Sequence, residues 1–280
     1  MRVLVTGGTG FVGVQVREFL QKRDIQVKVL SRRPSELLQL KGNEIGEYFD
    51  LFDPNSWPSP EKEDSLIHLA WGNLDNFLSA DHLVRELPAQ QEFLNKMTES
   101  GLSSLLVAGT CLEYGLVEGG VSENFGPNPT SPYGEAKLQL LIWLQELQRS
   151  RDFKLIWPRI FYAYGIGQTQ SALFPTIVKI LNSESSIIEI SDGSMERDFV
   201  AIELVASSIV DLLILDRDVG PVNVGTGSPL SIKAFIEMIA KDSGRSISIR
   251  EGARIVPNYE SRSFWSENSY FAGLFHREED

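Results

Sequence analysis

The chain has 280 residues, and its 42% hydrophobic content is ordinary for a packed core in one large domain or two interlocked smaller ones. The net charge of −12 is spread along the chain without a Lys/Arg-rich stripe, which argues against nucleic acid as a partner. A single cysteine, Cys111, excludes an intrachain disulfide and a cysteine-based metal cluster, and the three histidines lack ligand spacing, so no metal site is expected.

Short apolar runs alternate with helical patterns in the first half of the chain. The predicted strands are 3–6, 26–30, 47–51, 65–70, 102–108 and 154–157, and the predicted helices are 11–22, 82–100 and 132–150. Strands that are nearly all apolar imply a parallel sheet covered on both faces. The expected fold class is therefore α/β, a doubly wound parallel (Rossmann) sheet, with residues 1–163 forming an NADP-binding domain.

From about Tyr164, glycines and turn residues break the chain into shorter pieces. Helices are predicted at 172–181, 201–215 and 232–243. We interpret residues 164–280 as a smaller C-terminal α/β lobe that binds the substrate and is interleaved with the first domain. The pattern after Gly252 is too weak for an assignment.

Membrane and secretion signals are not expected. No apolar run approaches the length that spans a bilayer, and the first residues have the pattern of a core strand and not of a cleavable signal. Because a single cysteine suits a reducing compartment, we expect a cytoplasmic protein without a membrane partner.

The run RVLVTGGTGFVG, Arg2 to Gly13, passes from strand to helix through several glycines. Glycine inside a strand or helix is destabilising, so these glycines serve another purpose. At a strand-to-helix junction they let backbone N–H groups approach a pyrophosphate at the positive end of the helix. The GxGxxG spacing of Gly8, Gly10 and Gly13 therefore predicts a dinucleotide site.

The residues after the second strand favour NADP as the cofactor. NAD sites place an acidic residue there to bind the ribose hydroxyls, whereas this chain has Ser31, Arg32 and Arg33. Two guanidinium groups and a hydroxyl suit a 2′-phosphate, and no carboxylate at that point repels it. NAD is the alternative cofactor, and solvation of the sheet edge is the alternative role of the arginines.

The stretch PTSPYGEAK places Tyr133 and Lys137 on one face of a helix, with Ser131 as N-cap and Pro132 as first helical residue. An ammonium and the positive helix end both favour phenolate, so Tyr133 is expected to exchange a proton with a substrate near neutral pH. Thr110 ends the fifth strand, where its hydroxyl is expected to hold the reacting oxygen. The alternatives are a solvated helix face for the pair and a hydroxyl satisfied by local backbone for Thr110.

Together these motifs resemble the extended short-chain dehydrogenase/reductases of the NAD-dependent epimerase/dehydratase family, which act on nucleotide-sugars. Further matches are HLA at 68–70, PR-x-F-x-x-YG at 158–165, RDF-V at 197–200 and NVGTG at 223–227. The resemblance implies catalysis by Thr110, Tyr133 and Lys137, and substrate contacts by Tyr162, Phe174 and Arg197. It implies cofactor binding by Gly7, Thr9, Gly10, Phe11, Val12, Gly13, Ser31, Arg32, Arg33, Asp50, Leu51, Leu69, Ala70 and Trp71.

The resemblance also assigns Arg197 to the nucleotide diphosphate, against the alternative of a surface ion pair with Asp198. Dehydratases of the family place an Asp-Glu pair directly after the active-site threonine, but this chain has Cys111 and Leu112 there, so dehydration is not expected. We interpret Cys111 as a buried thiol. Glu113 has no role that the sequence assigns.

Proton exchange at Tyr133 and hydride exchange at a nicotinamide interconvert a sugar alcohol and a ketone. We expect NADPH-dependent reduction of the 4-keto group of a nucleotide-linked 4-keto-6-deoxy sugar. A nucleotide-sugar 4-epimerase with retained NAD is the alternative, and a non-enzymatic dinucleotide sensor is the second alternative. The resemblance also implies a homodimer packed through the helices 82–100 and 132–150.

Overall fold

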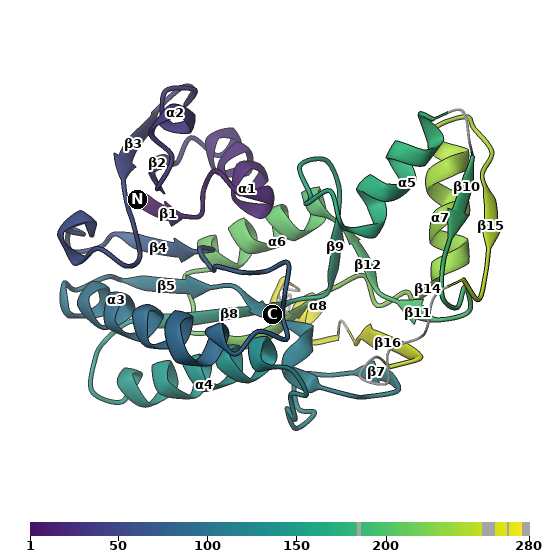
Figure 1. Ribbon diagram of the computed structural model, residues 1–280. Coiled ribbons are helices and arrows are strands. Elements are labelled where there is room, and N and C mark those ends of the chain that lie inside the picture. The colour runs from purple at the N-terminus through teal and green to yellow at the C-terminus, as the bar shows by residue number, and fades with distance from the viewer. Residues whose placement is uncertain (184–185, 254–260, 268, 276–280) are drawn as a thin grey trace, which may run out of the picture. The chain divides into compact units, whose positions relative to one another are not determined.

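A parallel sheet forms the centre of the first of two compact units, which comprises residues 1–115, 127–160 and 203–222. The structure, a computed structural model, describes residues 1–183, 186–253, 261–267 and 269–275 (Figure 1). The strand order is β13-β8-β5-β4-β1-β2-β3, with β6 beside β8, which confirms the predicted α/β class. The strands are β1 Arg2–Thr6, β2 Gln26–Ser31, β3 Glu44–Tyr48, β4 Ser65–His68, β5 Ser104–Val107, β6 Gly109–Thr110, β8 Lys154–Ile160 and β13 Gly220–Val224.

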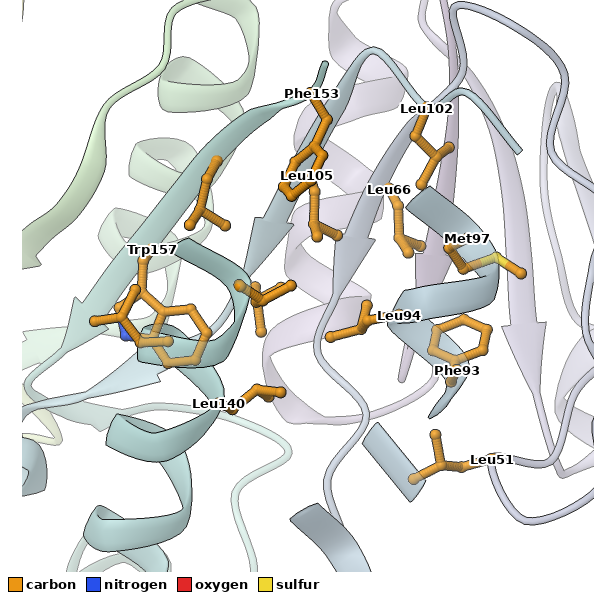
Figure 2. Close-up of a cluster of buried hydrophobic side chains, with 14 of the residues drawn as sticks. Leu51, Leu66, Phe93, Leu94, Met97, Leu102, Leu105, Leu140, Phe153 and Trp157 are labelled. Atoms are coloured by element: carbon orange, nitrogen blue, oxygen red, sulfur yellow. The ribbon is translucent and has the colours of Figure 1, made fainter. Parts of the chain in front are cut away.

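Helices cover both faces of this sheet (Figure 1). Side chains alternate along each strand, so the aligned Leu4, Leu66 and Leu105 point to one face. There they form a core with Leu94 of α3 and Leu140 of α4 (Figure 2). Burying a leucine of this kind stabilises the fold by roughly 1.5–3 kcal/mol. The helices of this unit are α1 Phe11–Lys22, α2 Pro34–Leu37, α3 Leu87–Glu99, α4 Pro132–Gln148 and α6 Ile202–Ile214, joined by 3-10 turns at Pro54–Ser56 and Cys111–Tyr114.

The helix predicted at 82–100 has two parts. It begins as a π-helical turn, His82–Glu86, in which the Leu87 N–H donates to the His82 carbonyl, and continues as α3. Pro88 has no N–H to donate and its ring crowds the carbonyl four residues earlier, so the turn before it widens. The predicted helical stretch is therefore confirmed, and its first turn is π-helical.

The third strand lies three residues earlier than predicted. Residues 47–51 show an apolar pattern, but β3 ends at Tyr48. Phe49 and Leu51, which produce that pattern, leave the sheet and are buried in the core of this unit.

The second compact unit comprises residues 116–126, 161–202 and 223–280. Its core includes Phe199 and Phe235, whose rings stack 3.9 Å apart. Its helices are α5 Leu173–Leu181, α7 Ile232–Asp242 and α8 Ser269–Phe275. Its strands pair as β9–β12, β10–β15 and β14-β11-β16-β7, with bounds β7 Gly119–Val121, β9 Tyr162–Tyr164, β10 Ile187–Glu189, β11 Glu196–Arg197, β12 Phe199–Ala201, β14 Leu230–Ser231, β15 Ser248–Arg250 and β16 Ser263–Ser266.

The chain passes back and forth between the units, so a single cut at residue 163 separates them only in part. Residues 116–126 belong to the second unit although they precede the cut, and residues 203–222 belong to the first although they follow it. The assignment of cofactor binding to one unit and substrate binding to the other stays a prediction.

Candidate active site

The glycine-rich loop joins β1 to α1 as the sequence predicts. Gly7 has a φ of +64°, a left-handed conformation that favours glycine, and a Cβ there would lie 2.9 Å from the Ala70 nitrogen. A Cβ on Gly13 would lie 2.2 Å from the Gly7 carbonyl oxygen, so the helix begins too close to the loop for a side chain there. Gly10 is the N-cap of α1, and no side chain caps the first turn, which contains Phe11 and Val12. Uncapped N–H groups at a helix N-terminus fit a pyrophosphate.

The end of β2 brings Ser31 to this loop. Its hydroxyl lies 3.0 Å from the Thr9 hydroxyl and accepts the Arg33 N–H at 3.1 Å. The Arg33 side chain is 69% exposed and pairs with Glu36 of α2 at 2.6 Å, while Arg32 is exposed. The expectation that this point lacks a carboxylate is therefore wrong, because one helical turn carries Glu36 back to Arg33.

A buried network fixes the adjacent ends of β1 and β4. His68 Nδ1 lies 2.8 Å from the Thr6 hydroxyl, and His68 Nε2 contacts Gln90, which donates to the Ala70 carbonyl at 2.9 Å. The Leu69 N–H donates to the Thr6 carbonyl at 3.2 Å. Burial lowers the pKa of His68 to about 3, so this histidine is neutral. Leu69 and Ala70 thus run beside the glycine loop, as a cofactor-lining role requires.

The two residues expected after the third strand lie in different surroundings. Asp50 accepts the Phe52 N–H at 3.1 Å through its carboxylate. The Leu51 side chain is 6% exposed and belongs to the core (Figure 2). A cofactor contact at Leu51 would therefore involve its backbone.

The helix that carries Tyr133 and Lys137 begins as predicted. Ser131 is the N-cap of α4, accepting the Gly134 N–H at 3.1 Å, and Pro132 is the first helical residue. Lys137 is buried and donates from Nζ to the Ala108 carbonyl at 2.8 Å. This bond ties α4 to the chain segment that leads into Thr110.

Burial dominates the ionisation of both side chains. It raises the pKa of the Tyr133 phenol, and the negative charge of Glu113 adds to this effect. It also lowers the pKa of Lys137 to about 7. The expectation of an acidic phenol is wrong, because desolvation, the largest cause, raises the pKa of Tyr133 above its ordinary value. Tyr133 therefore keeps its proton at neutral pH.

Trp71 packs against this pair. Lys137 Nζ lies 3.9 Å from the centre of the Trp71 ring, and the Tyr133 ring meets the same indole edge-on at 5.8 Å. The indole N–H donates to His82 Nδ1 at 3.0 Å. Trp71 therefore lies among the predicted catalytic side chains, while its expected cofactor contact stays a prediction.

Thr110 ends β6 and caps the 3-10 turn that follows. Its hydroxyl oxygen accepts the Leu112 N–H at 3.3 Å, so local backbone satisfies one lone pair of this oxygen, as in the alternative interpretation. The O–H proton is still available to donate to a ligand. A Cβ on Gly134 would lie 2.5 Å from the Leu112 carbonyl oxygen, so this turn packs directly on the first turn of α4. The structure therefore brings the Thr110 turn against the helix of Tyr133 and Lys137.

Glu113, which the sequence leaves without a role, anchors the same turn. Its carboxylate is fully buried and accepts the Thr110 N–H at 2.9 Å, the Trp157 Nε1–H at 2.9 Å and the Arg159 Nε–H at 2.8 Å. The Thr110-x-x-Glu113 spacing of a capping box was the available signal. The partners on β8 lie more than forty residues away in sequence, beyond the reach of local patterns.

The expected substrate residues lie in the second unit. The Arg197 guanidinium lies 5.4 Å from the Tyr162 ring centre and donates to the Glu196 carbonyl at 2.8 Å. Phe174 of α5 packs on another ring, Tyr164, at 5.7 Å. Arg197 and Asp198 are both buried, so the alternative of a surface ion pair is wrong.

Three further observations concern the described residues. Cys111 is a buried thiol, as predicted. No group of three or more His, Cys, Asp or Glu side chains there is arranged to hold a metal ion. No described helix combines the length and apolar character needed to cross a bilayer.

A Rossmann sheet with a glycine loop and a Thr, Tyr and Lys cluster defines a class of dinucleotide-binding protein. Residues 3–225 match the model of the NAD dependent epimerase/dehydratase family, and the chain belongs to this family.

Relatives cover nearly the whole chain. The dTDP-6-deoxy-L-talose 4-dehydrogenase (NAD(+)) of Aggregatibacter actinomycetemcomitans is 27% identical over 269 residues, which are 95% of this chain and 99% of that protein. An uncharacterized UDP-glucose epimerase of Bacillus subtilis is 26% identical over an alignment of 298 positions, gaps included, which covers 99% of this chain and 92% of that protein. The structure of MoeE5 in complex with UDP-glucuronic acid and NAD has a TM-score of 0.80 at 25% identity, covering 98% of this chain and 92% of that one.

Proposed function

We propose that this protein reduces the 4-keto group of a nucleotide-linked 4-keto-6-deoxy sugar with NADPH. The observation that carries the proposal is the packing of the Tyr133 phenol beside the buried Lys137 and next to the turn of Thr110, where burial raises the pKa of the phenol. A phenol that holds its proton at neutral pH suits a proton donor to a carbonyl oxygen. The relative named as a 6-deoxy-talose 4-dehydrogenase supports the choice of a 4-position and a 6-deoxy sugar.

Each residue has a defined task in this proposal. Thr110 donates its hydroxyl proton to the carbonyl oxygen in a hydrogen bond and so orients it, and Tyr133 transfers its phenolic proton to that oxygen as the ketone becomes an alcohol. A nicotinamide cofactor, when bound, would supply the hydride for the carbonyl carbon. Lys137 carries the positive charge that stabilises the phenolate left on Tyr133.

The cofactor and the nucleotide-sugar would be held by the residues that the sequence motifs predict. The loop of Gly7, Gly10 and Gly13 would hold the pyrophosphate, and Thr9, Ser31, Arg32 and Arg33 the adenosine ribose with its 2′-phosphate. We assign Arg197 to the nucleotide diphosphate, with Tyr162 and Phe174 contacting the nucleotide-sugar.

One specific observation favours the second candidate, a 4-epimerase that retains NAD. Glu36 already pairs with Arg33, which weakens the case for a 2′-phosphate at that guanidinium. Titrations of the protein with NADPH and with NADH decide the cofactor. Tighter binding of NADPH supports the reductase, while equal affinities reject the assignment of NADP.

The reaction is tested with NADPH and a panel of nucleotide-linked 4-keto-6-deoxy hexoses, by following the loss of reduced-nicotinamide absorbance. We expect oxidation of NADPH with at least one sugar. Conversion of UDP-glucose to its 4-epimer without net absorbance change would instead establish the epimerase. Binding of dinucleotide with neither reaction would favour the non-enzymatic sensor.

The role of Tyr133 is tested by Tyr133→Phe. This variant keeps the ring and loses the transferable proton, so we expect turnover to fall by at least about a hundredfold, the lower end of general acid contributions. NADPH affinity should stay within about twofold of the parent, because the phenol is not assigned to the pyrophosphate or the ribose. Turnover near the parent rate would remove Tyr133 from the mechanism.

A further inference from the structure

Lys137 is a buried cation whose partners are not carboxylates. Lys137 is 3% exposed, its Nζ donates to the Ala108 carbonyl at 2.8 Å, and Nζ lies over the face of Trp71, 3.9 Å from the ring centre. Within the described residues no carboxylate forms an ion pair with it. The ammonium has three N–H bonds, and one of them donates to Ala108.

The charged and titratable groups that face Lys137 come from every element packed on it. They are Glu113 on the 3-10 turn, Glu86 on the π-helical turn, His68 on β4, and Tyr133 on α4, with His82 behind the indole. The two glutamates act from a distance, since their carboxylates bond to Thr110, Trp157 and Arg159 in one case and to the Gly72 N–H in the other.

The orientation of the Trp71 ring is fixed from outside the site. An indole N–H can only donate, so His82 Nδ1 must accept it. The proton of His82 therefore resides on Nε2, which donates to the Asn76 carbonyl at 3.0 Å. His82 is fully buried and lies at the start of the π-helical turn, so Trp71, His82 and Asn76 form one rigid chain of hydrogen bonds.

We propose that Trp71 is a positioning residue for Lys137, holding its ammonium against the ring face, and that His82 acts through Trp71. This inference rests on the proposed role of Lys137. A ring face stabilises a buried cation without adding a negative charge. A carboxylate in the same place would disfavour the phenolate that forms on Tyr133 and would repel the anionic ligands expected nearby. The indole therefore favours the charged form of Lys137 without opposing the proton transfer.

The test measures the titration of Lys137 in the full-length protein without substrate. Lysine is labelled with 13C at Cε, and the Lys137 resonance is assigned by its loss in Lys137→Met. We expect Trp71→Leu to lower the titration midpoint by about 0.5–1.5 pH units, because the cation–π contact is lost, and Trp71→Phe to lower it by less. The matched control is Trp143→Leu. Trp143 lies on α4, the helix that carries Lys137, and this variant should leave the titration midpoint of Lys137 unchanged. A midpoint in Trp71→Leu equal to or above the parent value would overturn the proposal.

A second pair of variants tests the role of His82 and serves if Trp71→Leu does not fold. Gln can accept the indole N–H and donate to Asn76 as the neutral imidazole does, so His82→Gln should keep the midpoint near the parent value. His82→Leu removes both bonds and should shift the midpoint in the direction of Trp71→Leu. Equal midpoints in the two variants would show that His82 does not act through Trp71. Because no turnover is measured, these results stand apart from the outcome of the sugar-reduction assay.

Discussion

Burial sets the ionisation of the two residues on which the proposed chemistry depends. Sequence spacing alone places an ammonium beside a phenol and suggests an acidic phenol. In the folded chain the lysine pKa falls to about 7 and the tyrosine pKa rises, since both charged forms lose their water. Lys137 is thus close to half ionised at neutral pH, and small changes around it alter its charge.

Because Lys137 is buried, its titration should make the free energy of unfolding depend on pH. The folded state releases the lysine proton near pH 7, whereas the unfolded chain holds it to about pH 10.4. Between these values the unfolded state binds more protons, so stability rises with pH by up to about 1.4 kcal/mol per unit. Below pH 7 Lys137 is charged in both the folded and the unfolded chain, so its contribution to the free energy of unfolding no longer changes with pH.

Urea unfolding of the parent and of Lys137→Met between about pH 6 and pH 10 measures this contribution. We expect the free energy of unfolding of the parent to gain on that of the variant as pH rises above 7. Lys96→Met, at an exposed position on α3, is the control and should follow the parent at all pH values. A pH-independent difference between Lys137→Met and the parent would contradict the lowered pKa.

At the scale of elements, the turn Cys111–Tyr114 is held by a buried ion pair. Glu113 is fully buried and Arg159 is 3% exposed, and Arg159 also donates to the Tyr114 hydroxyl at 3.0 Å. A Cβ on Gly109 would lie 2.3 Å from Trp157 Nε1, so the strand end fits closely over this pair. The rigid base under Thr110 is therefore built from β6, β8 and the turn together.

Breaking the pair should be costly. Glu113→Gln leaves the Arg159 guanidinium buried without its counter-charge, for which we expect a loss of about 3–5 kcal/mol in the free energy of unfolding. Glu146→Gln removes the carboxylate of an exposed pair with Arg149 and should change stability by less than about 1 kcal/mol. Denaturant unfolding of both variants compares the two. A Glu113→Gln cost similar to that of Glu146→Gln would show that the buried charge is not what holds the turn.

The elements differ in how far the sequence predicts them. The helix 11–22 and the cap at Ser131 are set by local patterns and are confirmed. The π-helical turn depends on Pro88, and the position of β3 depends on where Phe49 packs, so both escape periodicity. The strands of the second unit have two to four residues each, too few to show a period.

In the candidate site, too, the residues within one local motif are predicted from the sequence, and the contacts between distant segments are not. The residues of the glycine loop and Tyr133 with Lys137 are found by spacing, because each group lies within one local motif. The contacts of Trp71 with Lys137, of Glu113 with Arg159 and of Arg33 with Glu36 need the folded chain or the course of a helix. Among these contacts only Arg33 with Glu36 has a local spacing, i to i+3, while the Thr110-x-x-Glu113 spacing signals the capping box and not the contact of Glu113 with Arg159.

At the scale of the whole molecule, α3 and the π-helical turn pack beside α4. Arg151 joins them at one end, donating to the Asn95 carbonyl and to the Thr98 hydroxyl at 2.9 and 2.6 Å. The outer surfaces of these helices carry large apolar side chains in water, since Val84 is 71% exposed and Ile142 is 56% exposed. Single exposed apolar residues are ordinary, whereas a contiguous apolar patch marks a protein–protein contact, and the family resemblance puts the dimer contact on these helices.

We therefore expect a homodimer that packs through these two helices, and Ile142→Glu should dissociate it. A charge buried in an apolar interface without a partner is strongly unfavourable, whereas at a solvent-exposed position it costs little. Sedimentation velocity at micromolar concentrations should give a dimer for the parent and a monomer for Ile142→Glu. A cooperative thermal unfolding transition of Ile142→Glu would show that the variant is still folded. Ile166→Glu, at an 84% exposed position in the second unit, is the control and should remain dimeric. A parent protein that sediments as a monomer, or an Ile142→Glu variant that stays dimeric, would exclude this face as the interface.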